Sequence, residues 1–315
     1  MIGFLEFILP QAVQTLLVVA IAPLMLGWVN QCRAWLQNRS GAGLLQPYRV
    51  LRKLFHKDAV IAHNASPLFR LSPYIQFGCM VLAASIVPSL ATNLVLSPAA
   101  DVIALVGLFA LARVFGALAA MDVGTAFGSL GARREMLIAS LSEPALLMVF
   151  FTPLLIAQSS SLSTIVDALA HRQFALYPSL AFAAVAFLMV VLAENARIPI
   201  DNPATHLELT MIHEAMILEY SARHLALIEW ATAAKLVVYS AIGFALFVPW
   251  GMATQWQAIP AAIAVLIGKL AFTGAVLAVI EMVSAKMRIF RAPEFLAMAF
   301  LLAVLGMLTH ILLER

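Results

Sequence analysis

Charged residues are scarce in this sequence, at 11% of its 315 positions, while 63% of the residues are hydrophobic. Soluble domains carry about 25% charged residues. This imbalance excludes an ordinary soluble globular domain and a disordered segment. It also excludes an outer-membrane barrel, whose alternating strands keep the mean hydropathy low, whereas here the mean hydropathy is +0.97. A helical integral membrane protein remains.

Cysteine is almost absent, because the chain has only Cys32 and Cys79. Two thiols are too few for a disulfide framework. They are also too few for an iron–sulfur cluster held by four thiolates. Any redox centre that belongs to the function of this protein must therefore lie on another subunit.

Apolar stretches of bilayer length recur along the chain. A transmembrane helix needs roughly 20 apolar residues, and about eight stretches reach that length. They run roughly over 8–29, 72–93, 99–120, 136–157, 174–195, 223–249, 258–283 and 293–313. The sequence therefore predicts an all-α integral membrane protein, with a single membrane domain over residues 1–315.

Basic residues lie mainly in alternate loops. Fourteen of the 19 Lys and Arg residues fall in loops 30–71, 121–135, 196–223 and 284–292. The opposite side has only Arg172 and Arg315. Because cytoplasmic loops carry the excess of basic residues, these four loops should face the cytoplasm and both termini should lie outside.

Several charges fall inside the predicted spans, where each costs about 2.5–3.5 kcal/mol. They are Arg113, Glu143, Glu194, Glu229, Lys235, Lys269 and Glu281. Buried pairs that only fix helix packing, such as Glu229 with Lys235, are one interpretation. A file of acids and lysines that carries protons or ions is the other.

Residues 194–203 end a span and begin a long acidic loop on the cytoplasmic side. Pro199 and Pro203 exclude a regular helix through this segment. The acids in the loop are Asp201, Glu208, Glu214 and Glu219. The pattern favours a buried acidic cavity beneath the membrane surface, with a solvated loop of ordinary charges as the alternative.

Residues 44–57 place Val50, Leu51, Leu54 and Phe55 at helical spacing opposite a basic face. This pattern predicts an amphipathic helix in the cytoplasmic interface, and a helix packed beneath a partner subunit fits it equally. We expect no metal site, because His213 lacks the second histidine that a zincin motif needs four residues later.

Four segments carry a resemblance to a known family. They are the loop 38–47, the stretch 122–135 followed by Glu143-Pro144, the acidic loop with 194–201, Glu208-Leu209 and 219–221, and the charged positions Lys235, Lys269 and Glu281. On these segments the chain resembles the subunit 1 family of respiratory complex I. It is more similar to the counterpart of that subunit in membrane-bound group 4 NiFe-hydrogenases of the formate hydrogenlyase and hydrogenase-4 type.

The resemblance implies a non-catalytic membrane anchor subunit of an oxidoreductase complex in the inner membrane of a bacterium or archaeon. The hydrogenase large and small subunits and the iron–sulfur subunits would dock on the cytoplasmic loops and would carry the NiFe centre and the iron–sulfur clusters. Antiporter-like membrane subunits would pack beside the spans, and electron transfer would be coupled to proton or sodium movement.

The resemblance also implies two groups of functional residues. The coupling cavity would be formed by Arg39, Asp122, Arg134, Glu135, Glu143, Glu194, Arg197, Asp201, Glu208 and Glu219. A polar file would continue into the membrane through Arg113, Glu229, Lys235, Lys269 and Glu281.

The sequence departs from the family pattern at three positions. Ala42 stands where the family has Pro, and Ala204 and His206 stand where the acidic loop has two more carboxylates. These departures favour a hydrogenase-4-like branch with altered coupling. The alternatives are a quinone-chamber subunit 1 of an NADH-quinone oxidoreductase, with quinone as a possible ligand, and a non-conducting structural scaffold.

Overall fold

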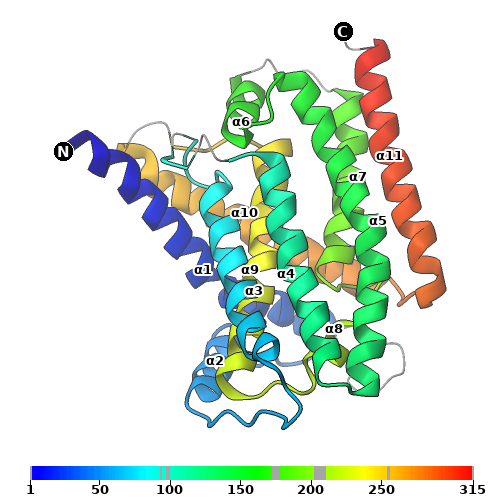
Figure 1. Ribbon diagram of the computed structural model, residues 1–315. Helices are drawn as coiled ribbons and strands as arrows, with labels where there is room; N and C mark the ends of the chain where they lie inside the picture. The colour runs from blue at the N-terminus through cyan, green and yellow to red at the C-terminus, as the bar shows by residue number, and fades with distance from the viewer. Residues whose placement is uncertain are drawn as a thin grey trace.

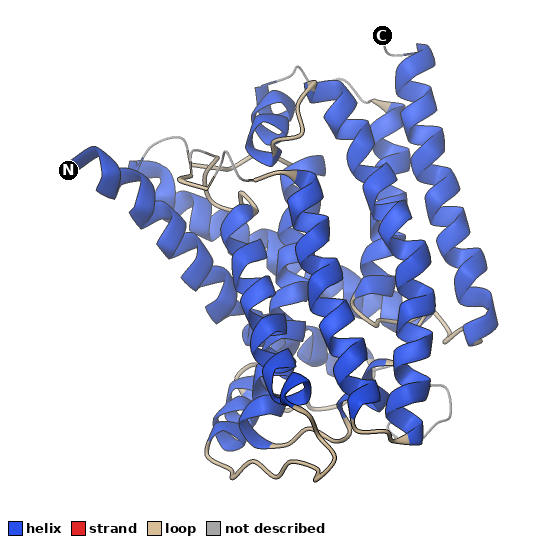
Figure 2. Ribbon diagram, viewed as in Figure 1, coloured by secondary structure: helices blue, strands red, loops and turns tan. Residues whose placement is uncertain are grey.

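The computed structural model describes residues 2–92, 94–96, 100–171, 177–201, 211–253 and 256–313. Over these residues the chain forms helices and no strand (Figure 2). Six helical segments among them are long and apolar enough to cross a membrane, which confirms the predicted all-α membrane protein. These segments are Pro10–Leu36, Val102–Asp122, Ala126–Ala157, Ala222–Phe247, Ile259–Val283 and Ile289–Leu313.

Each of the eight predicted spans coincides with a helix, but two of these helices are not among the six. Helix α3 (Pro67–Ile86) carries the polar residues Arg70, Ser72 and Gln76. Helix α7 (Pro178–Glu194) has only 17 residues. The number of membrane crossings therefore stays a prediction.

Helices α1 and α3 differ in length from the spans predicted there. Helix α1 runs over Ile2–Leu36, and at its C-terminal end it passes well beyond the predicted limit at 29, because residues 28–36 contain no glycine or proline that would end it. Helix α3 ends at Ile86 although the predicted span continues to 93. Val87 precedes Pro88, and a residue before proline is pushed from the helical into the extended conformation, which Val87 adopts with ψ 119°.

Helix α5 (Ala126–Ala157) begins ten residues before the predicted start at 136. Thr125 caps it, because its hydroxyl accepts a hydrogen bond from the Gly128 amide at 3.4 Å. Residues 133–135, predicted to lie in a loop, are therefore helical. This difference matters for the site, since it places Glu135 on the same helix as Glu143.

Helix α9 (Ala222–Phe247) packs against α1, α3 and α7. The apolar window of α9 is 67% buried, against 28% for α10 (Ile259–Val283) and for α11 (Ala292–Leu313). Helices α4 (Val102–Asp122), α5, α7 and α11 stand side by side, while α1 is steeply tilted and packs on α10 (Figure 1). Shorter elements join them: α6 (Leu162–His171), α8 (His213–Ile217) and the 3-10 turns Trp256–Ala258 and Ile289–Arg291.

Helix α2 (Gln46–Phe55) lies at one end of the bundle (Figure 1). Its Leu51 and Leu54 are buried against Ala226 of α9. Arg49, Arg52 and Lys53 are exposed. The amphipathic helix predicted within 44–57 is thus present, with its apolar face on the protein and its basic face outward.

Two glutamines on α1 hold the chain that follows α3. Gln14 is fully buried. Its Nε2 donates to the Val87 carbonyl at 2.7 Å, and its Oε1 accepts from the amides of Ser89 and Leu90 at 3.2 and 3.1 Å. The Nε2 of Gln11 donates to the Ser85 carbonyl, and its Oε1 accepts from the Leu96 amide. These bonds satisfy backbone groups that have no helical partner where α3 stops.

We expect the substitution Gln14→Leu to lower the stability of the protein by at least about 2 kcal/mol, because it leaves several buried backbone groups without a partner. Thermal unfolding in detergent micelles measures the effect. Thr15→Ala is the matched control, since the Thr15 hydroxyl donates to the Gln11 carbonyl of its own helix. Equal melting temperatures for the two variants would contradict the anchoring role of Gln14.

Candidate functional site

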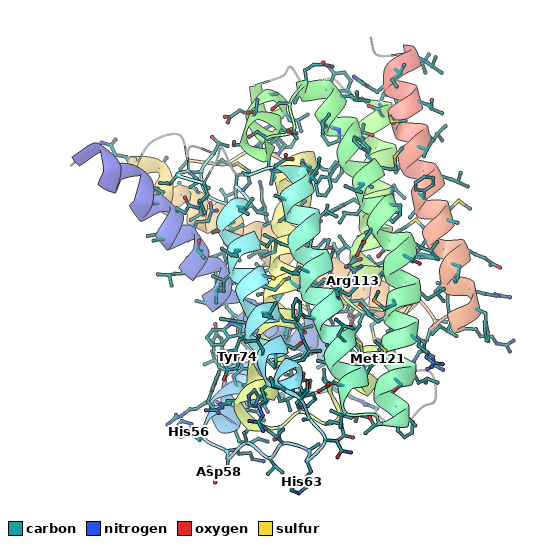
Figure 3. All side chains as sticks on the ribbon, viewed as in Figure 1. His56, Asp58, His63, Tyr74, Arg113 and Met121 are labelled. Carbon is teal, nitrogen blue, oxygen red and sulfur yellow. The ribbon has the colours of Figure 1, made fainter. Side chains whose placement is uncertain are left out.

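A buried arginine on α4 contacts three carboxylates from two other helices. The Arg113 side chain is 4% exposed. Its guanidinium lies 2.7 Å from Glu143 and 3.7 Å from Glu135, both on α5, and forms an ion pair with Glu194 at the end of α7. Figure 3 places Arg113 inside the bundle, between α4 and α5. Glu135 and Glu143 reach the same arginine because residues eight apart lie near one face of a helix.

Glu194 has further partners that complete this cluster. Lys235 of α9 lies 3.0 Å from its carboxylate and donates to its backbone carbonyl at 2.6 Å. The Ser142 hydroxyl donates to its other carboxylate oxygen. We call Arg113, Glu135, Glu143, Glu194 and Lys235 the Arg113 cluster. With every group ionised it carries two positive and three negative charges, so it can accept one proton and become neutral.

A second cluster forms around the C-terminal end of α10. Arg197 lies 2.9 Å from one carboxylate oxygen of Glu281, and Arg33 of α1 lies 3.3 Å from the other. We call these three residues the Arg197 cluster. Glu194 and Asp201 are the acids nearest to Arg197 in the sequence. Glu281, 84 residues away on α10, binds Arg197.

The turn that ends α7 separates the two clusters. Ala196 adopts a left-handed conformation with φ +48°. The Arg197 amide donates to the Leu192 carbonyl at 2.9 Å, and the Ala196 amide donates to the Ala193 carbonyl at 3.2 Å. This is the Schellman arrangement of a helix C-terminus. It reverses the chain so that Glu194 and Arg197, three residues apart, face different clusters.

Three neighbouring cavities connect these charges. Cavity A, of about 80 Å³, is lined by Arg113, Glu135, Glu194 and Lys235 among others. Cavity B, of about 120 Å³, is lined by Arg197, Asp201, Glu214 and Glu229. Cavity C, of about 360 Å³, lies between α1, α2 and α9 and shares Arg197, Glu214 and Glu229 with cavity B. Cavities A and B share four residues, so the three form a row.

The structure brings together part of the predicted coupling cavity. Glu135, Glu143 and Glu194 join two residues of the predicted polar file, Arg113 and Lys235, in one cluster. Glu229, also from the predicted file, lines cavities B and C with Arg197.

Asp201 fixes the backbone beside cavity B. It accepts hydrogen bonds from the amides of Ile212 and His213 at 3.3 and 3.2 Å, and it lies 3.7 Å from Lys286.

Other predicted residues of the coupling cavity lie apart from the clusters. Asp122 accepts a hydrogen bond from the Ser66 amide at 2.8 Å, and Arg134 donates to the Met211 carbonyl at 3.0 Å. Arg39 and Glu219 are exposed and line none of the three cavities. Glu208 lies outside the described residues.

Lys269 also lies apart from the polar file in which the sequence placed it. Its ammonium group donates to the carbonyls of Val248 and Trp250 at 2.7 and 2.6 Å, where α9 ends. A lysine in this position stabilises the negative end of the helix dipole.

Sequence reasoning missed Ser142 and Arg33. A serine inside an apolar span gives no signal of its own, although Ser142 precedes Glu143. Arg33 was assigned to a loop because the predicted first span stopped at 29, and the extension of α1 carries it to Glu281.

Comparisons with known proteins agree on one family. A family model described as NADH dehydrogenase matches residues 10–312. Formate hydrogenlyase subunit 4 of Escherichia coli (strain K12) is 31% identical over 284 residues, which is 90% of this chain and 92% of that protein. Hydrogenase-4 component C of the same organism is 33% identical over 243 residues, covering 77% and 76%.

Two further relatives extend the comparison. A subunit of the NADH-quinone oxidoreductase of Rickettsia bellii (strain OSU 85-389) is 30% identical over 264 residues, covering 78% of this chain and 75% of that protein. A chain of the membrane-bound sulfane sulfur reductase, an archaeal respiratory membrane complex, superposes with a TM-score of 0.83 at 20% identity. That superposition covers 95% of this chain and 99% of that chain and shows a shared fold.

The Arg113 cluster predicts that Arg113→Met destabilises the protein by about 3–5 kcal/mol, because removing one partner leaves buried carboxylates uncompensated. Thermal unfolding measures the loss. Adding Glu194→Gln to Arg113→Met should cost less than the two single losses combined, since the two residues interact directly. Strict additivity in this cycle would rule out the ion pair.

Proposed function

This chain belongs to the NADH dehydrogenase subunit 1 family, and from that premise we propose that it anchors the peripheral redox arm of a formate hydrogenlyase or hydrogenase-4 type complex and couples electron transfer to proton movement. The match to formate hydrogenlyase subunit 4 covers more of both proteins than the match to the Rickettsia bellii protein does. That difference supports the hydrogenase branch. The complex would lie in the cytoplasmic membrane, with the basic loops and the arm on the cytoplasmic side.

The observation that carries the coupling role is the Arg113 cluster. A buried arginine and a lysine hold three carboxylates, of which that of Glu194 is buried, beside a row of cavities. Buried ionisable groups inside a membrane protein are costly and mark ion or proton pathways. A purely structural anchor needs no carboxylate beyond those that neutralise its two cations, and this cluster has a third.

Coupling in this arrangement is electrostatic. A charge change in the docked arm alters the field at Asp201, Glu214 and Glu229, which line cavity B on the side of the acidic loop. The preferred protonation of the Arg113 cluster then changes, because charges in a low-dielectric region interact over several ångströms. A proton is released each time the cluster gains its third negative charge, and a proton is taken up each time the cluster loses that charge.

Glu143 gives protons a route from the Arg113 cluster to the lateral surface of this chain. It lies near the middle of α5, and its side chain is 34% exposed on the surface of this chain. On the same face of α5, seven residues earlier, Met136 is exposed and apolar. A carboxylate at that depth is stable only against polar or basic groups. We therefore assign this side of α5 to an antiporter-like membrane subunit that receives the proton.

Purification of the tagged protein in mild detergent should recover an iron–sulfur arm with stoichiometric nickel. Mass spectrometry identifies the partners, and elemental analysis quantifies nickel and iron. A flavin-containing dehydrogenase arm without nickel would instead assign the chain to an NADH-quinone oxidoreductase. Recovery of the chain alone would contradict both assignments.

Glu143→Gln should leave the complex assembled and abolish proton movement, because the amide cannot take up a proton. The measurement is the number of protons moved per electron by the complex in liposomes. Glu294→Gln is the matched control, since Glu294 is an exposed acid in the first turn of α11. An unchanged ratio in Glu143→Gln would refute this route.

A further inference from the structure

Asn195 places an unsatisfied polar atom in the interior of the protein. The residue is 5% exposed. Its side-chain Nδ2 donates to the Val191 carbonyl at 2.9 Å. Its Oδ1 has no hydrogen-bond partner among the residues that the structure describes. A buried acceptor left in this state costs about 1–3 kcal/mol, so a ligand that donates a hydrogen bond to it would stabilise the protein.

The position of Asn195 is fixed by the backbone. It directly follows the last residue of α7, and its amide donates to the Val191 carbonyl at 3.1 Å. The Schellman turn through Ala196 and Arg197 holds it from the other side. The side-chain Nδ2 is bonded back to the helix, so the Oδ1 on the other branch of the amide points away from that bond.

Asn195 lies between cavities A and B. The residues that line both cavities are Asn195, Ala196, His213 and Thr232. Of these two cavities, A is the one lined by Glu135 and Glu194, and B is the one lined by Asp201, Glu214 and Glu229. The unsatisfied oxygen is therefore at the boundary between the two groups of acids.

Polar groups that can form hydrogen bonds with a water molecule surround this boundary. Lys235 has three N–H donors and uses two of them on Glu194. His213 and Thr232 approach each other at 3.4 Å, and the Thr232 hydroxyl donates to the Ile228 carbonyl. A buried water needs a cavity above about 10–15 Å³ and two to four polar partners. Cavities of about 80 and 120 Å³ meet the first condition, and these side chains meet the second.

We propose that the Oδ1 of Asn195 binds an ordered water molecule that joins cavities A and B. This water relays protons between Glu229 and Glu214 on one side and the Arg113 cluster on the other. It accepts a proton from a carboxyl group on one side and releases another to a carboxylate on the opposite side, so an O–H bond breaks at the first acid and forms at the second while the Asn195 amide stays neutral. The relay rests on the proposed coupling function, whereas the bound water does not.

The test compares two variants of Asn195 in the intact complex. Asn195→Leu has a similar size and no acceptor, and we expect it to lose the water and most of the proton movement per electron. Asn195→Asp keeps an oxygen acceptor and should restore both. The readouts are the proton-to-electron ratio in liposomes and the density for the water in a high-resolution cryo-electron microscopy map.

Thr152→Val is the matched control. The Thr152 hydroxyl is another buried oxygen without a partner in the described part of the chain, but it lines none of the three cavities. This variant should keep the ratio of the unaltered protein. Loss of coupling in Thr152→Val as well would overturn the proposal, because the effect would then follow from any change to a buried oxygen.

Glu194→Gln, measured in parallel, separates the relay from the function on which it rests. If Glu194→Gln loses proton movement and Asn195→Leu keeps it, the relay is wrong and the coupling function stands. If both keep it, the coupling function itself fails. Absence of ordered water beside Asn195 in the unaltered complex would overturn the proposal directly.

Discussion

The burial of Arg113 is the constraint on which the arrangement of the bundle depends. Its guanidinium cannot lose its charge in a protein, so the helices around it must supply anions. Helices α4, α5 and α7 are apolar around most of their circumference, and hydrophobic burial alone selects no particular face of such helices. The ion pairs to Glu143 and Glu194 supply that selection and so fix how α5 and α7 are rotated.

The sequence predicts the positions of the helices well, because the length of an apolar run is a local property. It also predicts that Glu143, Glu194 and Lys235 act together, since each is costly alone at membrane depth. The pairing of Arg197 with Glu281 could not be predicted, because 84 residues separate them and only the packing of α10 decides which acid is near. The charge of Lys269 suggested that it belongs to the polar file. In the structure its ammonium group instead donates hydrogen bonds to carbonyls at the end of α9.

A single turn of backbone links the two charge clusters. Glu194 and Arg197 are three residues apart, and the turn at Ala196 directs one toward α4 and the other toward α10. Because the turn is held by its own hydrogen bonds, a shift of either side chain acts on the other through a short and stiff path. A change of charge at Glu281 can therefore shift the Glu194 side chain through Arg197 and this turn, without a rearrangement of whole helices.

The order of the charges along the chain has a consequence for biosynthesis. Helix α9 has the lowest hydropathy of the six membrane-length segments, 1.5, and it carries both Glu229 and Lys235. Inserted alone, it would be poorly retained in lipid. Its partner Glu194 is synthesised earlier, as are Arg113 and the two acids of α5. The later charged helices thus enter a membrane that already holds their counterions, and the electrostatic cluster serves as a template during translation.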